Sequence, residues 1–174
     1  MALTQIIGSG IGTVTNQFAD ANMSAGSIIQ AVDTSDATQT TVQNTTFTDT
    51  GLTLSITPQS TSSKILVTCS QDVQVWNTSN YATGRWRIMR NIGGGSFSAI
   101  YQDSSAGNGN FFAYDYGGSG INIYMPISMT LIDQPSTTSA CIYKTQVCQG
   151  TNGGNRVVAN NASPARIVLM EIAG

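Results

Sequence analysis

Apolar and polar residues alternate along residues 51–75, and this period of two is the clearest structural signal in the chain. Residues 52–56 alternate apolar side chains with threonine and serine, and residues 65–75 show a similar alternation. A period of two places the apolar side chains on one face of a strand and the polar ones on the other. Pro58 has no N–H to donate to a strand ladder, and residues 60–63 are typical of a polar turn. The segment therefore predicts two half-buried strands of an antiparallel sheet.

Short alternating runs of the same kind recur through the rest of the chain. Glycine-rich stretches such as residues 93–95 and 117–120 separate them and are typical of turns. Pro126 interrupts the longest run and indicates either a bulge or a division into two strands. No stretch shows a convincing helical period. We expect further strands at residues 27–32, 45–48, 85–90, 97–102, 110–116, 121–133, 140–149 and 166–172.

This number of short strands predicts an all-β fold, either a sandwich or a barrel. A jelly roll fits best, because eight to ten strands in about 150 residues match its two four-stranded sheets. An immunoglobulin-like sandwich is the second choice, since the Cys…Trp…Cys spacing of true immunoglobulin domains is missing. We therefore expect a jelly-roll-like antiparallel β-sandwich over residues 26–174, preceded by an extended N-terminal arm over residues 1–25.

The expected arm, residues 1–25, differs from the rest of the chain because it shows no sustained period. It contains three glycines and scattered apolar residues. Alone, such a segment buries too little apolar surface to offset the entropy cost of ordering it. We expect a docking arm that is held by a neighbouring molecule, and an arm folded back on its own domain is the alternative. Its candidate docking residues are Leu3, Ile6, Ile7, Ile11, Val14 and Phe18.

The last expected strand is apolar on both of its faces. Ile167 and Leu169 share one face, whereas Val168, Met170 and Ile172 share the other. A strand of this kind is normally covered on both sides. We expect the domain core to cover one face, and either a partner subunit or a segment of the same chain to cover the other. Val168, Met170 and Ile172 are therefore the candidate subunit interface.

Charged residues make up only 9% of the chain, compared with about 25% in an average globular domain. Uncharged polar surfaces let subunits pack closely without burying unpaired charge. The net charge of −2 gives no electrostatic reason to bind nucleic acid, and no apolar run is long enough to span a membrane. Arg85, Arg87 and Arg90 form a basic cluster, which we expect to be solvated or paired with Asp103, Asp115 or Asp133.

The residues of the usual enzyme and metal sites are largely missing. With no histidine, Ser-His-Asp and Cys-His catalytic arrangements are impossible. Glu171 is the single glutamate and has no evident carboxylate partner for glycoside hydrolysis. Cys69, Cys141 and Cys148 form no C-x-x-C pair, so a zinc site needs an atypical ligand set. We expect no catalytic activity, no cofactor and no bound metal, and the odd number of thiols fits folding in a reducing cytoplasm.

Two stretches of the sequence resemble a module that is common in structural proteins of tailed bacteriophages. They are "GLTLSITPQSTSSKILV" at residues 51–67 and "ARIVLMEIAG" at residues 165–174, and the resemblance extends over roughly residues 26–174. The module occurs in tail-fibre tips and in other proteins of the virion surface. The resemblance implies a β-sandwich that folds in the host cytoplasm and acts on the virion surface, as a homotrimer beside capsid or tail proteins. The matching strands belong to the structural framework of the module. The resemblance therefore implies no particular role on the particle.

Two hypotheses for function remain open at this stage. One is a capsid-decorating (cement) protein that trimerises and docks through its arm. The other is a tail-fibre or tail-tip subunit that binds a host surface glycan. Phe112, Tyr114 and Tyr116 share one face of an expected strand and are the candidate glycan contacts, although such a row more often fills a core or an interface.

Overall fold

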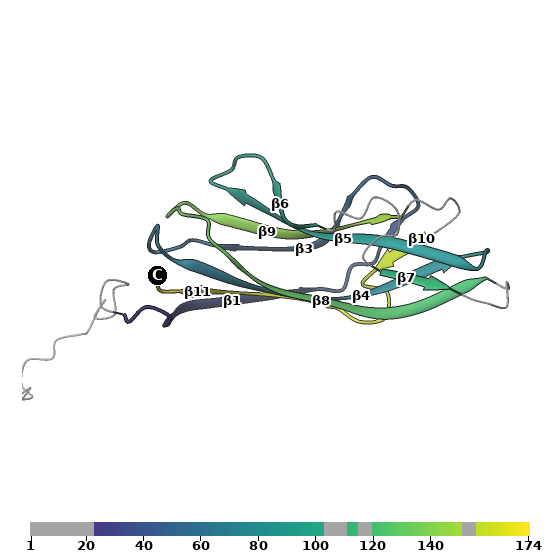
Figure 1. Ribbon diagram of the computed structural model, residues 1–174, viewed down its shortest axis with the longest axis horizontal. Helices are drawn as coiled ribbons and strands as arrows, with labels where there is room; N and C mark the ends of the chain where they lie inside the picture. The colour runs from purple at the N-terminus through teal and green to yellow at the C-terminus, as the bar shows by residue number, and fades with distance from the viewer. Residues whose placement is uncertain (1–22, 103–110, 115–119, 151–155) are drawn as a thin grey trace, which may run out of the picture.

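The computed structural model describes residues 23–102, 111–114, 120–150 and 156–174, and all regular structure in these ranges is β-strand (Figure 1). No helix long and apolar enough to cross a membrane occurs in these ranges. The strands are β1 (Ile28–Asp36), β2 (Thr40–Val42), β3 (Thr48–Ile56), β4 (Lys64–Asn77), β5 (Tyr81–Ile92), β6 (Ser98–Gln102), β7 (Phe111–Tyr114), β8 (Ile121–Asp133), β9 (Cys141–Gln149), β10 (Arg156–Ala159) and β11 (Ala165–Ile172).

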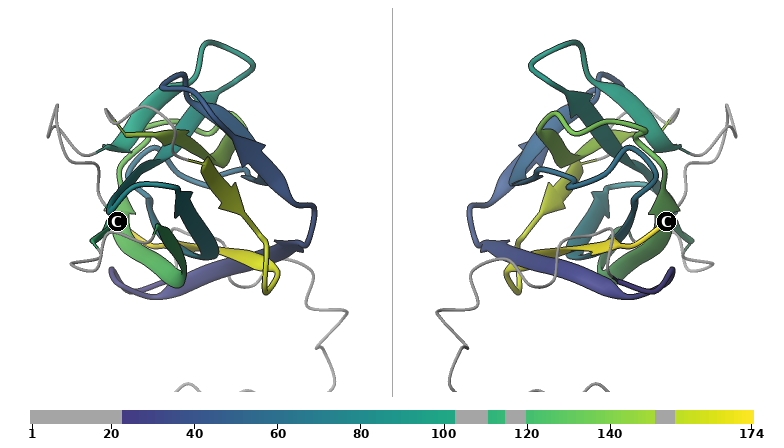
Figure 2. Two further views of the ribbon diagram at one scale, coloured as in Figure 1. Left: turned by 90° about the vertical axis from the view of Figure 1, so that its right-hand side faces the viewer. Right: turned by 90° about the vertical axis from the view of Figure 1, so that its left-hand side faces the viewer.

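The strands form two antiparallel sheets. Sheet A contains β1, β11, β4, β10 and β2 in that order, and β8 pairs with the other side of β4. Sheet B contains β3, β9, β5 and β6 in that order, and β7 also pairs with β5. Viewed along the long axis of the molecule, the two sheets form the two layers of a sandwich (Figure 2).

The strand pairs are nested, as if one long hairpin were folded over. The first strand pairs with the last, β1 with β11, in sheet A, and β3 pairs with β9 in sheet B. Further inward along the chain, β4 pairs with β8 in sheet A, and β5 pairs with β6 in sheet B. Nested antiparallel pairs that alternate between two sheets define a jelly roll. The expected jelly-roll-like β-sandwich is therefore confirmed.

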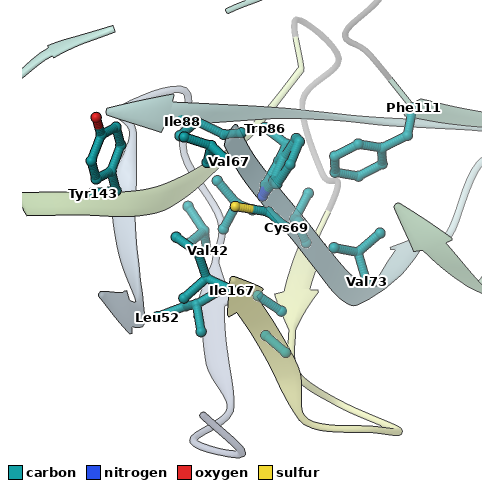
Figure 3. Close-up of a cluster of buried hydrophobic side chains, with 14 of the residues drawn as sticks. Val42, Leu52, Val67, Cys69, Val73, Trp86, Ile88, Phe111, Tyr143 and Ile167 are labelled. Carbon is teal, nitrogen blue, oxygen red and sulfur yellow. The ribbon is translucent and has the colours of Figure 1, made fainter. Parts of the chain in front are cut away.

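One apolar core lies between the two sheets. Val67 and Cys69 of β4 and Ile167 of β11 are fully buried, because alternate residues of these strands point inward. Trp86 of β5 meets them from sheet B, and side chains from both sheets are shown together in Figure 3. The period-two pattern of residues 51–75 thus corresponds to β3 and β4, and the apolar residues of its alternating face line the core.

β8 is an edge strand of sheet A, with β4 as its only ladder partner among the described strands. Its register with β4 is unbroken from Ile121 opposite Asn77 to Asp133 opposite Ile65. The expected bulge or division at Pro126 is therefore wrong. Proline is tolerated in an edge strand because its missing N–H falls on the open side, where no partner needs it.

Short strands were the hardest to predict. The strand expected at residues 45–48 is wrong: the chain bends there, with Thr46 N donating to Asn44 Oδ1 at 2.9 Å, before β3 begins at Thr48. β2 and β10 were not predicted at all. They span only three and four residues, which is too short to show a period, and they form because β10 fits between β2 and the distal half of β4.

Candidate assembly face

The outer face of sheet A carries an apolar patch at the end of the sandwich where β1 begins and β11 ends, which we call the proximal end. Met170 of β11 lies opposite Leu66 of β4, and Leu66 lies opposite Ile132 of β8. One row further along, Ile172 lies opposite Ile28 of β1. Side chains in adjacent rows on one face of a sheet are neighbours. The proximal apolar patch comprises Ile28, Leu66, Ile132, Val168, Met170 and Ile172.

The described residues leave this patch partly open to solvent. Ile28 and Ile132 expose 57% and 58% of their surface, and the other four members are partly exposed. By contrast, Ile167 and Leu169, on the opposite face of β11, are fully buried in the core. β11 therefore has the two apolar faces that its sequence indicates, and only the inner face is fully covered. The structure places Val168, Met170 and Ile172 together on the outer face, and their contact with a partner stays a prediction.

The N-terminal segment enters the domain at the same end. Gly26 N donates to Ala173 O, and Ala173 N donates to Ser27 O, each at 2.9 Å. These bonds fix residues 23–27 beside the end of β11, next to the proximal apolar patch. The candidate docking residues of the arm lie outside the described residues, so the docking arm also stays a prediction; they are Leu3, Ile6, Ile7, Ile11, Val14 and Phe18.

Charged residues lie at the border of the patch. Arg166 Nη1 of β11 lies 3.7 Å from Asp33 Oδ2 of β1, and the two side chains are 63% and 57% exposed. Lys64 lies opposite Ile172 on the same face of sheet A. An apolar centre with a charged border is the usual organisation of a protein–protein interface.

The aromatic row expected to contact glycans is only partly described. Tyr114 of β7 is 50% exposed, and its ring centroid lies 6.3 Å from that of Tyr81 in β5. The backbone of Phe112 belongs to β7, but its side chain and the whole of Tyr116 lie outside the described residues. Phe111 points into the core instead, at 4% exposure. The row of Phe112, Tyr114 and Tyr116 therefore stays a prediction.

Arg90 forms the ion pair with Asp133 that the sequence analysis expects. Arg90 Nη1 donates to Asp133 Oδ1 at 2.6 Å and to Oδ2 at 2.8 Å. The Tyr143 hydroxyl also donates to Asp133 Oδ2, at 2.8 Å. Burial, together with this hydrogen bond, raises the pKa of Tyr143 well above its ordinary value. The cluster joins β5, β8 and β9 across the two sheets, so its role is structural; Asp103 and Asp115 lie outside the described residues.

Arg87 is also held within the domain. Its guanidinium lies 3.9 Å from the ring centroid of Phe47, and it donates to Gln146 and Gln102 at 2.7 Å each. Such contacts fix the charge on the outer face of sheet B. Arg87 and Arg90 are therefore both held within the framework of the domain.

The three cysteines are buried free thiols. Burial raises the pKa of each of them, and that of Cys69 reaches about 12. Since the thiolate is the reactive form, these cysteines are poor nucleophiles and poor metal ligands. Cys141 and Cys148 lie on opposite faces of β9, as their spacing of seven residues indicates. Within the described part of the chain, no group of three acidic, histidine or cysteine residues could hold a metal ion.

Fold and surface together define a jelly-roll β-sandwich with an apolar outer face at its proximal end. No protein-family model matches the chain, and no curated protein matches it. Among solved structures, it is similar to one of infectious bursal disease virus, Gx strain (TM-score 0.34, 12% identity, 87% of this chain and 39% of that chain). It is also similar to a mutant VP2 protein of the same virus in derived T=1 particles (TM-score 0.33, 12% identity, 83% of this chain and 36% of that chain). The chain spans less than two-fifths of the length of either structure, and similarity this low establishes neither fold nor function.

Proposed function

We propose that this protein is a non-enzymatic structural protein of a bacteriophage virion that decorates the capsid as a cement protein. Its copies associate as homotrimers, and each docks onto the particle surface through residues 1–25. The observation that carries this proposal is the proximal apolar patch, which lies at the end where the N-terminal segment enters the domain. The resemblance of residues 51–67 and 165–174 to phage structural modules supports the virion setting.

Burial of the patch supplies association energy. Fully burying one exposed isoleucine, leucine, valine or methionine side chain contributes about 1.5–3 kcal/mol. A stable interface of standard size, however, buries about 800 Å² on each partner, and six partly exposed side chains offer only part of this area. The six apolar residues of the arm supply the remainder. Because only 9% of the residues of the chain are charged, the desolvation cost of such packing is low.

Ile132→Lys tests the patch directly. The substitution places an ammonium group in an interface that must exclude water, so we expect trimer formation and incorporation into particles to fall about tenfold or more. Tyr124→Lys is the matched control, because Tyr124 lies on the same strand and the same outer face but at the other end of β8, at 51% exposure. Sedimentation velocity measures trimer formation, and the copy number on purified particles measures incorporation. Equal losses in both variants would contradict a role specific to the patch.

Deletion of residues 1–25 tests the arm. The described strands build an apolar core between the two sheets, so we expect the truncated protein to fold with an unchanged cooperative unfolding transition. We also expect it to be absent from purified particles, because the arm carries the docking contacts. Unchanged incorporation would exclude the docking role of the arm while leaving the patch proposal intact.

A second candidate function is a tail-fibre or tail-tip subunit that binds a host surface glycan. It is favoured by exposed aromatic residues at the end opposite the patch, where β4 turns into β5; we call this the distal end. Tyr114 and Tyr124 are each about half exposed there. Copy number on purified virions separates the two functions: hundreds of copies favour decoration, and a few to a few tens favour the tail.

A further inference from the structure

The outer face of sheet A at the distal end combines exposed aromatic rings with side-chain amides. Trp76 of β4 is partly exposed, and Tyr124 of β8 exposes 51% of its surface. Both residues point outward, because the alternate residues Val75 and Ile121 are buried in the core. A cleft of about 250 Å³ opens beside Trp76. It is lined by Trp76, Asn77, Thr78, Gly120, Ile121 and Asn122.

The side chain of Trp76 is held between two strands. Arg156 of β10 lies opposite it on one side, with the guanidinium carbon 5.3 Å from the ring centroid. Asn122 of β8 lies opposite it on the other side. Because β10 and β8 flank β4 on opposite sides, Arg156 and the cleft lie on opposite sides of the indole. The cation–π contact holds the ring, while its other side borders the cleft.

A chain of amides fixes the polar groups next to this ring. Gln74, at 4% exposure, donates through Nε2 to Asn122 Oδ1 and, at 3.2 Å, to the Tyr124 hydroxyl oxygen. Its own Oε1 accepts a hydrogen bond from Asn161 Nδ2 at 2.8 Å. These contacts occupy the acceptor atoms of Asn122 and Tyr124. Within the described part of the chain, Asn122 Nδ2, the Tyr124 hydroxyl proton and Trp76 Nε1 have no acceptor, so three unpaired donors lie at neighbouring outward positions of β4 and β8.

We propose that this surface, the distal sugar site, binds the terminal neutral sugar of a glycan. The C–H face of a pyranose ring is apolar and packs on an aromatic face, while its hydroxyl oxygens accept hydrogen bonds from donors at the edge. Trp76 supplies the face, and Asn122 and Tyr124 supply the donors. None of the six residues that line the cleft is charged, and the Arg156 guanidinium packs on the other side of the indole, so we expect a neutral sugar to bind in preference to an acidic one. The volume is below the roughly 300–1,000 Å³ of pockets for drug-sized ligands, which fits a single sugar ring.

This inference rests on the second candidate function, and it moves the glycan contact from the predicted row at Phe112, Tyr114 and Tyr116 to a different sheet. In an aromatic patch at a protein–protein interface, the polar atoms of the rings normally form hydrogen bonds with groups of the partner protein. Here the donors are arranged by a buried glutamine before any ligand arrives, which reduces the entropy cost of binding a small polar molecule.

The full-length protein is tested first on an array of neutral and sialylated glycans. It is then titrated with the methyl glycosides of glucose, galactose, N-acetylglucosamine and rhamnose. Intrinsic tryptophan fluorescence is a direct readout: the chain has two tryptophans, and Trp86 is buried at 3% exposure. We expect a saturable change in fluorescence with at least one neutral glycoside. If no neutral glycan binds the wild-type protein, the glycan-binding function itself fails.

Three variants then locate the site. Trp76→Phe should abolish the fluorescence response, and Trp76→Ala should weaken array binding about tenfold or more, as for a central aromatic contact. Asn122→Ala removes one exposed donor together with one of the two acceptors of Gln74 Nε2, which keeps the Tyr124 hydroxyl oxygen, and it should weaken binding about two- to tenfold. Tyr114→Ala is the matched control on the outer face of sheet B and should bind as the wild type does. If Tyr114→Ala loses binding while Trp76→Ala and Asn122→Ala retain it, glycan binding stands and the distal sugar site is wrong. Binding of sialylated glycans alone would also overturn it.

Discussion

At the residue scale, the side chain that the sequence explains least is Glu171. It lies in β11 among core residues and is fully buried. Its carboxylate accepts hydrogen bonds from Gln59 N, at 2.6 Å, and from Gln30 Nε2. These bonds fasten the turn after Pro58 and strand β1 to β11. A buried carboxylate with two donors thus stands where the sequence pattern alone indicates an apolar residue.

Glu171→Gln should destabilise the domain by about 1–3 kcal/mol, because one acceptor oxygen becomes an N–H group that faces a donor. Urea denaturation at neutral pH measures the change. Asp33→Asn is the control: this carboxylate is 57% exposed and has only a 3.7 Å contact with Arg166, so we expect a change within about 0.5 kcal/mol. If Glu171→Gln and the wild type are equally stable, the two hydrogen bonds make no net contribution to the free energy of unfolding.

Cys69 should make the protein sensitive to alkaline pH. Burial raises the pKa of its thiol from 9.0 to about 12, so the folded state holds a proton that the unfolded chain releases. The stability that this contributes is complete below about pH 9 and is lost as the pH rises towards 12. Three pH units correspond to an upper limit of about 4 kcal/mol. Burial and Asp133 also raise the pKa of Tyr143. This group therefore adds a further loss of folding stability above about pH 10.

The corresponding measurement is the free energy of unfolding from pH 8 to pH 11 under reducing conditions. Wild-type stability should fall with rising pH, and Cys69→Ala should show a shallower slope although it is less stable at pH 8. Ser128→Thr changes no titratable group and should leave the slope unchanged. A slope in Cys69→Ala as steep as that of the wild type would assign the alkaline loss to other groups.

At the element scale, β8 presents thirteen residues at an open edge of sheet A, and Pro126 lies near its centre. An uninterrupted edge of this length would pair with the same edge of another copy. Proline removes one donor from the open row, so it should oppose such pairing. The copies of this protein should therefore meet through the outer face of sheet A, and edge-to-edge pairing should be suppressed.

Pro126→Thr restores that donor in a residue that favours strands. We expect the stability of the domain to change by less than about 1 kcal/mol and self-association to increase with protein concentration in sedimentation velocity. Ser128→Thr is the control, because it changes the neighbouring outward position of β8 without adding a backbone donor. If the two variants associate to the same extent, the edge is not protected by Pro126.

Elements with a long alternating pattern could be predicted from the sequence, and short ones could not. β4 and β8 were predicted from their long alternation, and β11 was predicted from its continuous apolar run. β10 is held mainly by its neighbours, so no local signal marks it. The outward residues of β11 could be predicted as an apolar face, but their alignment with Leu66 and Ile132 depends on strand pairing. The amide chain from Gln74 to Asn122 and Tyr124 was not predictable either, because it joins residues about fifty positions apart.

At the scale of the whole molecule, the sandwich has two chemically different ends. The proximal end holds the apolar patch, the C-terminal residues and the entry of the N-terminal segment. The distal end holds Trp76, Tyr124 and their amides, and β8 runs from one end to the other along the same face (Figure 1). A molecule that attaches through its proximal end therefore presents its distal end outward. This arrangement suits a decoration protein and a fibre tip equally well.

If the two ends act independently, substitutions at each end should separate their functions. Ile132→Lys should remain a monomer and stay off particles, yet bind neutral methyl glycosides with the wild-type affinity. Trp76→Ala should lose sugar binding and still join particles at the wild-type copy number. The double variant should show both losses without an additional effect, because distant sites without shared partners combine additively. Loss of sugar binding in Ile132→Lys would instead show that the distal sugar site is complete only in the assembled oligomer, and the site would then have to include a second copy of the chain.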